Sequence, residues 1–360
     1  MASTCNKILR ALPMVLAIVV VLVLMLAACN RYNNQPGPGT DSDIDVAIGI
    51  GGTTLVVYST FSSDFTAPII EMFEERYNVS VELYTASTTH TLARLRAEAA
   101  NPQADLMWGG SIFAVAPQLD LFGSFTSINE PFVLPSHKNT TGVLTSFTAN
   151  AGILIINTDM VSDIEINGYL CLLNPALRGR IAIAYPSATP TSFCHLTSQL
   201  YAMGSDSPHT GWEYINQLVI NIGGIILPDS AAVHRGVLDG DFIVGLTYED
   251  AFLSYAETNA HIKVVYIDEG VIPAQTVAGI VNGAINREGA EAFIDFITSY
   301  EVQTFIEANL QRRAVRSDVQ PHGIPVANTN INWVIADAVY IIEHRETWVE
   351  QFWDIWMTHN

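Results

Sequence analysis

The chain has 360 residues, which is enough for about two domains with hydrophobic cores of their own. It carries 36 acidic residues against 16 lysines and arginines, a formal net charge of −20 at pH 7. So acidic a balance argues against nucleic acid and against anionic membrane surfaces as binding partners.

The N-terminus has the pattern of a secretory signal. Lys7 and Arg10 precede an uncharged apolar run from Ala11 to Ala28, and Cys29 follows it directly. The residues at that point, Leu26-Ala27-Ala28-Cys29, resemble a bacterial lipobox, in which cleavage falls before a cysteine that carries a diacylglycerol. We therefore expect residues 1–28 to be a signal peptide and Cys29 to be lipidated. The alternative is an uncleaved transmembrane anchor, because the run is nearly long enough to span a bilayer.

Residues 29–53 are predicted to be a lipidated flexible tether, because they are rich in Asn, Gly, Pro and Asp and have no helical period. Loss of Lys7 and Arg10 with the signal would take the net charge from −20 to −22. The other two cysteines of the mature chain, Cys171 and Cys194, show no spacing motif. We expect them to be free and buried, although an oxidising compartment would permit a disulfide.

Strand and helix patterns alternate from Thr54 onward. Strands are predicted at 55–58, 79–83 and 106–108. A helix that opens at Pro68 and ends near Asn78 separates the first two strands. A second helix, marked by Leu92 and Leu95, is expected to stop at Asn101-Pro102. This β-α-β-α-β order predicts a parallel sheet with helices on both faces.

The same alternation returns in the second half of the chain. Strands are predicted at 153–156, 181–184, 243–246 and 264–266, and helices around 196–203, 212–221 and 231–238. Helical periods mark 290–297 and 333–342. The sequence has no dinucleotide turn, Walker loop, zinc-protease helix or nucleophile elbow. A hydrolase or oxidoreductase therefore has no support from particular residues.

Small hydroxyl residues and glycines follow several predicted strands where helices begin. These positions are Ser59-Thr60, Ser87-Thr88, Gly109-Gly110-Ser111, residues 187–192 and Ser230. Ligands of open α/β sheets bind beyond the carboxyl ends of strands, and helix N-termini attract anions. If these helix starts face one cleft, they could together hold a small anion or a polyol. Taken singly, each hydroxyl could simply be a helix N-cap.

Other residues are also candidates, and some of them have both a structural and a functional interpretation. Glu249 and Asp250 could be first-turn acids that complement a helix dipole, or acceptors for hydroxyl or amino groups of a ligand. Trp108 could be a stacking platform or part of the core. His195 and His234 are expected to be structural. A solvated salt-bridge patch is expected at three arginines: Arg312, Arg313 and Arg316.

Stretches between Thr54 and the C-terminus carry a family resemblance. They include residues 94–110 (RLRAEAANPQADLMWGG), the segments DSAAVHRGVLDG and GLTYEDA within 229–251, and 312–316 (RRAVR). Together they resemble a substrate-binding protein of an ABC importer, of the ferric-iron, 2-aminoethylphosphonate and sugar-phosphate type. The resemblance implies an α/β fold of periplasmic-binding-protein type II. That fold is a two-lobed Venus flytrap in which each lobe is a sheet flanked by helices.

The resemblance also implies domain boundaries and a site. Lobe one would be 54–148 plus 274–360 and lobe two 149–273, with ligand bound between them and hinge motion closing them. No catalytic residue, cofactor or resident metal is implied. The contacts carried over by position are Ser59, Thr60, Thr88, Gly109, Gly110, Asn150, Thr191, Ser192, Ser230, Ala231 and Glu249.

The implied function is capture of a small phosphorylated or phosphonate solute for an ABC permease and its ATPase. The protein would be a monomer held in the cell envelope by lipid. The alternative is ferric iron on the same scaffold. Iron-binding members often present two adjacent tyrosines, and none of the 13 tyrosines here adjoins another, although isolated Tyr, Asp and Glu could still supply hard oxygen ligands. A more remote alternative is a lipid-anchored envelope enzyme, which lacks a nucleophile–base set.

Overall fold

The computed structural model describes residues 49–161, 163–205, 207–249, 259–310, 312–320 and 331–360. The chain divides into two units, 1–51 and 52–360, and the second unit contains both sheets of the fold. The predicted signal peptide and Cys29 lie outside the described residues. Within those residues, no helix is both long enough and apolar enough to cross a membrane.

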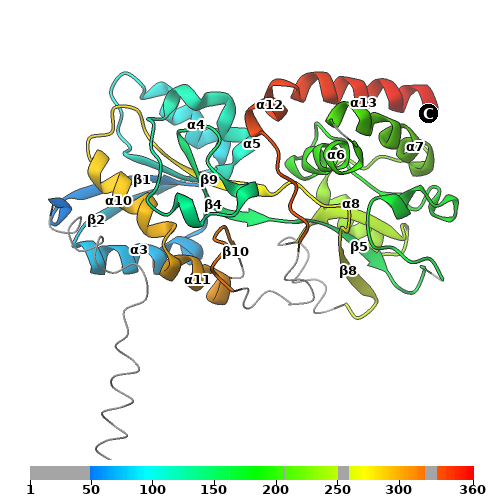
Figure 1. The fold of residues 1–360 in the computed structure, drawn as a ribbon, viewed down its shortest axis with the longest axis horizontal. Coiled ribbons are helices and arrows are strands. Elements are labelled where there is room, and N and C mark those ends of the chain that lie inside the picture. The colour runs from blue at the N-terminus through cyan, green and yellow to red at the C-terminus, as the bar shows by residue number, and fades with distance from the viewer. Residues whose placement is uncertain (1–48, 162, 206, 250–258, 311, 321–330) are drawn as a thin grey trace, which may run out of the picture. The chain divides into compact units, whose positions relative to one another are not determined.

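The first sheet is mixed, with strand order β10-β4-β9-β3-β1-β2 (Figure 1). As predicted, β1 runs parallel to both β2 and β3. β9 is antiparallel to β3 and β4, and β10 is antiparallel to β4. The predicted parallel arrangement therefore holds for β1, β2 and β3, and the sheet as a whole is mixed because β4, β9 and β10 join it. The strands are β1 (Thr54–Ser59), β2 (Ser80–Thr85), β3 (Leu106–Ser111), β4 (Leu144–Asn150), β9 (Ala274–Ile280) and β10 (Arg313–Ala314).

Helices cover both faces of this sheet, as predicted. Figure 1 shows α3 and α11 on one side and α4 and α5 on the other. On the first side the ring of Phe73 in α3 lies 4.9 Å from that of Phe293 in α10, which makes an apolar layer against the sheet. The helices are α3 (Ser63–Tyr77), α4 (Thr88–Ala97), α5 (Ile112–Val115), α10 (Arg287–Ile297) and α11 (Tyr300–Asn309).

Two predicted helix limits need correction. α3 begins at Ser63 rather than at Pro68, which lies inside the helix. The proline gives up one backbone hydrogen bond, but Phe65 and Ile69 on either side of it are buried and hold this turn against the sheet. α4 ends at Ala97, before the predicted stop at Asn101.

The second sheet has the strand order β6-β7-β5-β8. Alternate side chains of β5 face opposite layers: Ile153 and Ile155 pack under α8, whereas Leu154 and Ile156 belong to the cluster beneath α6 and α7. The elements are β5 (Gly152–Asn157), β6 (Ile181–Ala182), β7 (Val244–Tyr248), β8 (Ile262–Tyr266), α6 (Pro190–Met203), α7 (Trp212–Ile222) and α8 (Ser230–Leu238). All are near their predicted places, although β6 is shorter than 181–184.

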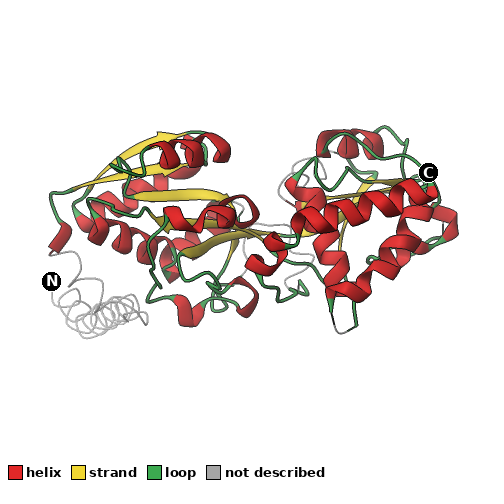
Figure 2. Cartoon of the chain, turned by 90° about the horizontal axis from the view of Figure 1, so that it is seen from above, coloured by secondary structure: helices red, strands yellow, loops and turns green. Residues whose placement is uncertain are grey.

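The C-terminal helices contact elements around both sheets. α12 (Ala338–Glu343) packs on α5, whereas α13 (Arg345–His359) packs on α7, where Figure 2 shows it among the helices. A helix through Trp333 was predicted, and this is wrong: Trp333 forms a parallel bridge with Val271 instead. Short 3-10 helices span Ala116–Leu121, Glu130–Phe132, Pro135–His137, Leu170–Leu173, Pro175–Leu177 and Pro208–Gly211.

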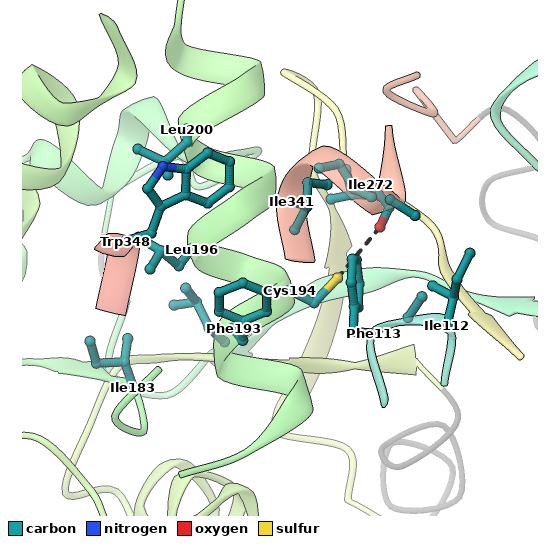
Figure 3. Packing of buried hydrophobic residues seen from close by; sticks show 14 of the residues in the cluster. Ile112, Phe113, Ile183, Phe193, Cys194, Leu196, Leu200, Ile272, Ile341 and Trp348 are labelled. Carbon is teal, nitrogen blue, oxygen red and sulfur yellow. Dashed lines mark hydrogen bonds between the residues drawn. The ribbon is translucent and has the colours of Figure 1, made fainter. Parts of the chain in front are cut away.

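One apolar cluster includes residues from around both sheets (Figure 3). The ring of Phe113 in α5 meets that of Phe193 in α6 edge-on, with 5.9 Å between centroids. The thiol of Cys194 in α6 lies 3.6 Å from the carbonyl oxygen of Ile272. Cys194 and Cys171 are both free thiols, as predicted, but Cys171 is only partly buried.

The chain passes between the sheets along neighbouring strands. β4 leads through Ala151 directly into β5, and β9 begins beside the end of β4, with Asn150 opposite Ala274. The division into lobes of 54–148 plus 274–360 and 149–273 stays a prediction. The contact of α13 with α7 shows that the last residues touch the second of these ranges.

Candidate functional site

The carboxyl ends of the first three strands bring one group of predicted residues together. Ser59 lies opposite Trp108 in the sheet, and its hydroxyl donates to the carbonyl oxygen of Trp108 at 2.9 Å. A Cβ atom on Gly109 would stand 2.3 Å from Oγ1 of Thr60. A Cβ atom on Gly110 would stand 3.0 Å from the methyl group of Thr88. Five predicted contacts are therefore neighbours.

Glycine is required at both of these positions. Gly109 has φ +119° and Gly110 has φ +92°, conformations that other residues rarely adopt. The bare backbone here could come close to a ligand. Trp108, just before them, is fully buried with its ring centroid 5.5 Å from that of Phe61 and 5.2 Å from that of Phe293. It belongs to the core and is not a stacking platform.

A second group gathers where α6 and α8 begin. Oγ1 of Thr189, the N-cap of α6, accepts the backbone N–H of Ser192 at 3.0 Å and lies 2.8 Å from Oγ of that residue. The hydroxyl of Ser230, the first residue of α8, donates to Oγ1 of Thr189 at 3.5 Å. Thr191 and Ala231 follow in the first turns of these helices. The two helices thus begin at one point. A hydroxyl residue, Thr189, is the N-cap of α6, whereas the N-cap of α8 is Asp229 and not Ser230.

Two histidines tie these helices to β7. His195 of α6 is buried, with Nε2 2.9 Å from the carbonyl oxygen of Thr247 and Nδ1 3.0 Å from the hydroxyl of Tyr169. Burial lowers the pKa of His195 to about 4, so the ring is neutral at neutral pH. Nε2 of His234 in α8 lies 2.5 Å from Oγ1 of Thr247. His195 is a buried structural residue, as predicted. His234 is partly buried, and its structural role stays a prediction.

The register places the two groups on either side of the β4–β5 connection. At the end of β3, Ser111 lies opposite Thr276 of β9, two residues from Ala274 and its partner Asn150. At the end of β7, Tyr248 lies opposite Gly152 of β5, and its hydroxyl donates to the carbonyl oxygen of Pro190 at 3.3 Å. Along β4 and β5, Asn150 therefore lies between the group at the ends of β1 to β3 and the group where α6 and α8 begin.

Glu249 is already engaged within the protein. Its carboxylate accepts hydrogen bonds from Nε and Nη2 of Arg313, each at 2.5 Å, and from the hydroxyl of Tyr266. Its predicted contact with ligand stays a prediction, and Asp250 lies outside the described residues. The expected solvated arginine patch is wrong for Arg313 and Arg316, which are 9% and 5% exposed.

Three residues that organise this region are not among the predicted ligand contacts: Thr189, Arg313 and Tyr266. Thr189 stands directly before Pro190, and a hydroxyl residue followed by proline is a known helix start. For Arg313 the signal is its spacing from Val315. Side chains two residues apart in an extended segment face the same side, and both of these are buried. For Tyr266 the sequence holds no comparable signal.

Among the described residues, no group of three or more His, Cys, Asp and Glu side chains is placed to hold a metal ion. The donors present are backbone N–H groups at helix starts, hydroxyls and glycine backbone. Such a set suits an anion or a polyol better than a soft metal.

Two α/β sheets joined by neighbouring strands, with helix starts on either side of the connection, define a type II periplasmic binding protein. The model of the family of bacterial extracellular solute-binding proteins matches residues 54–309, and the chain belongs to this family. It is a solute-binding protein of the ABC-importer type.

Individual proteins agree with this assignment. Iron uptake protein A1 of Synechocystis sp. is 26% identical over 270 residues, which cover 67% of this chain and 74% of that protein. The periplasmic binding protein AfuA from Actinobacillus pleuropneumoniae, solved with fructose-6-phosphate, superposes with a TM-score of 0.63 at 19% identity, covering 85% of this chain and 99% of that one. The Bordetella ferric binding protein gives 0.72 at 16% identity, covering 84% and 98%. The two structures establish the type II fold, and they are binding proteins rather than enzymes.

Proposed function

We propose that the protein captures a small phosphorylated or phosphonate solute between the two groups of residues and delivers it to an ABC permease and its ATPase. The observation that carries this proposal is the meeting of α6 and α8, whose first hydroxyls, Thr189 and Ser230, lie 3.5 Å apart. Backbone N–H groups and the positive dipole end at a helix start attract anions. Two such ends at one point favour a phosphoryl or phosphonyl group.

The acidity of the chain does not oppose such a ligand at short range. Screening limits charge repulsion to about 8–10 Å at physiological salt. The carboxylate at the end of β7, that of Glu249, forms an ion pair with Arg313. Glu249 therefore presents a compensated carboxylate to an anion near this point. Another carboxylate here is that of Asp229, the N-cap of α8, which accepts the backbone N–H of Ala232 at 2.7 Å.

Ferric iron is the second candidate. Similarity to iron uptake protein A1 and to ferric binding proteins favours it, as do the oxygens of Glu249 and Tyr266 at the end of the second sheet. The hydroxyls of Tyr248 and Tyr266 donate to other protein groups, however, and an iron-bound tyrosine must be a phenolate. We therefore rank iron below the phosphorylated solute.

Isothermal titration of the ligand-free protein tests the proposal. Hexose phosphates and 2-aminoethylphosphonate should release or absorb heat and raise the melting temperature. The matched sugars without phosphate should bind more weakly, and Fe³⁺-citrate should give no visible tyrosinate–iron band. If no phosphorylated compound gives heat or a thermal shift, the ligand class is wrong. An enzyme would release inorganic phosphate from the hexose phosphate, and we expect none.

We further propose that lipid on Cys29 holds a monomer in the cell envelope. The lipobox-like residues Leu26 to Cys29 support the anchor, and the stretch up to residue 53 has the composition of a tether. A Cys29→Ser substitution should abolish lipidation and leave residues 1–28 uncleaved, whereas a chain that starts at Asn30 behind a non-lipoprotein signal should move to the soluble fraction. Mass spectrometry of the N-terminal peptide would show whether a diacylglycerol is present, and light scattering would measure the oligomeric state.

A further inference from the structure

A buried ion pair joins the two sheets. Arg313 belongs to β10 of the first sheet, and Glu249 directly follows β7 of the second. Nε and Nη2 of Arg313 each donate to a different carboxylate oxygen of Glu249, so the contact is bidentate. Arg313 is 9% exposed and Glu249 is 2% exposed. Neither charge is left to solvent.

Tyr266 completes this group. Its hydroxyl donates to the carboxylate of Glu249, and Nη2 of Arg313 lies 3.2 Å from the same hydroxyl oxygen. The guanidinium carbon also lies 5.5 Å from the centre of the Tyr266 ring. Arg313 therefore contacts every polar oxygen of the Glu249 and Tyr266 side chains.

The backbone places this group beside the proposed ligand site. The N–H of Glu249 donates to the carbonyl oxygen of Ala151 at 3.0 Å, and Arg313 lies opposite Ala149 in the sheet. Asn150, one of the predicted ligand contacts, is the residue between Ala149 and Ala151 in the chain. Tyr266 lies opposite Ile153 on β5.

A carboxylate and a tyrosine oxygen in contact are the hard oxygen donors that Fe³⁺ prefers. We propose that Arg313 determines the specificity of this site: it occupies the oxygens of Glu249 and Tyr266, repels a cation there, and so excludes ferric iron. This inference rests on the proposed function, because it explains why a scaffold shared with ferric binding proteins would select an anion.

The state of Tyr266 agrees with this role. Burial, and after it the neighbouring negative charge of Glu249, raise the pKa of Tyr266 above its usual value. The hydroxyl is therefore protonated at neutral pH and acts as a donor. Iron binding would form Fe–O bonds to Glu249 and Tyr266 and displace water from the iron. The phenol proton would pass to the buffer, and no electron would be transferred.

Titration with ferric nitrilotriacetate tests the inference, because this chelate leaves adjacent iron positions open for two protein oxygens. The wild-type protein should give no visible tyrosinate–iron band. Arg313→Gln should gain a saturable band, and Arg313→Gln with Tyr266→Phe should lack it. Arg312→Gln, which removes the same charge one residue away, is the matched control and should behave as the wild type does.

Arg313→Gln leaves a buried carboxylate unpaired, so it could fail to fold. Arg313→Lys then replaces it: one ammonium group keeps the charge but cannot cover both carboxylate oxygens and the hydroxyl, so a weaker band is expected. A band in the wild type, no band in the folded arginine variant, or a band that survives Tyr266→Phe would each overturn the inference. Titration of the wild type with hexose phosphates decides the proposed function separately.

Discussion

The hydroxyl of Ser230 lies 3.5 Å from that of Thr189, so α8 and α6 begin side by side although 40 positions of chain separate them. His234 and His195 bind the same residue of β7, Thr247, one through its hydroxyl and the other through its carbonyl oxygen. The packing of both helices on one strand thus sets the distance between their N-termini. Changes at these helix starts should therefore affect ligand binding.

Thr189→Ala should weaken ligand binding and also lower stability, because it removes the N-cap of α6 and the acceptor for Ser230. The loss of stability should be about 0.5–2 kcal/mol, the usual effect of an N-cap. Ser299→Ala is the matched control, since Ser299 caps α11 by accepting the N–H of Val302. Urea unfolding and calorimetric titration measure both quantities. Equal ligand affinity in the two variants would contradict a binding role for Thr189.

Gly109→Ala should be more damaging than Gly142→Ala. Both glycines have positive φ, which costs other residues about 1–2 kcal/mol. A Cβ atom at Gly142 meets nothing within 4 Å, whereas at Gly109 it would clash with Thr60. We expect both variants to lose stability, but only Gly109→Ala to lose ligand affinity. A Gly109→Ala variant that binds as tightly as Gly142→Ala would remove this loop from the site.

Stability should fall in acid partly because of His195. Its pKa in the folded protein, about 4, is below the unfolded value of about 6.5. The unfolded chain therefore binds the proton first, and the stability that neutral His195 contributes is complete above pH 6.5 and lost as pH falls toward 4. The difference amounts to about 3 kcal/mol.

His195→Gln keeps a donor for the carbonyl oxygen of Thr247 but cannot titrate, so its unfolding free energy should change less between pH 7 and pH 4. His261→Gln, at a partly exposed position, serves as the control. His137 is also buried with a pKa lowered to about 3, and its contribution is common to all three proteins. Parallel pH profiles for His195→Gln and the wild type would contradict the assignment.

Breaking the Glu249–Arg313 pair should cost far more than breaking an exposed pair. Removal of one partner of a buried ion pair typically costs about 3–5 kcal/mol, because the other charge stays buried. Glu301→Gln, which breaks the partly exposed pair with Arg76, should cost at most about 1 kcal/mol. The double variant Glu249→Gln/Arg313→Gln should recover part of the loss of Glu249→Gln alone. Additive losses in urea unfolding would show that the pair is not coupled.

The sequence was sufficient for the elements whose side chains follow one clear period. The buried runs at Leu55–Tyr58 and Ile153–Ile156 form strands, and the helix around Ala290–Ile297 is present. β4 and β9 were not predicted because small and polar residues interrupt them. Thr145, Ser146 and Gln275 are buried in these strands, where the pairing of β4 with β9, rather than hydrophobic alternation, holds them.

Trp333 shows the opposite error. The apolar spacing from Trp333 to Ile342 fits a helix, yet Ile335 is 68% exposed and Trp333 pairs with Val271. Periodicity cannot tell a helix from an extended segment that contacts several neighbours. For the site, the sequence placed hydroxyls at helix starts but could not show that Glu249 meets Arg313. That contact joins residues far apart in the chain, and no local pattern encodes it.

The pairing of Asn150 with Ala274 has a consequence for how such proteins diversify. The chain leaves the first sheet after Asn150 and returns to it at Ala274, which lies opposite Asn150 on the same rung of the β4–β9 ladder. A segment whose ends lie side by side can be exchanged without disturbing its host, as in domain insertion and circular permutation. A chimera that joins relatives at this rung would be continuous in its backbone, but it would also have to match the contacts of α13 with α7 and the Glu249–Arg313 ion pair.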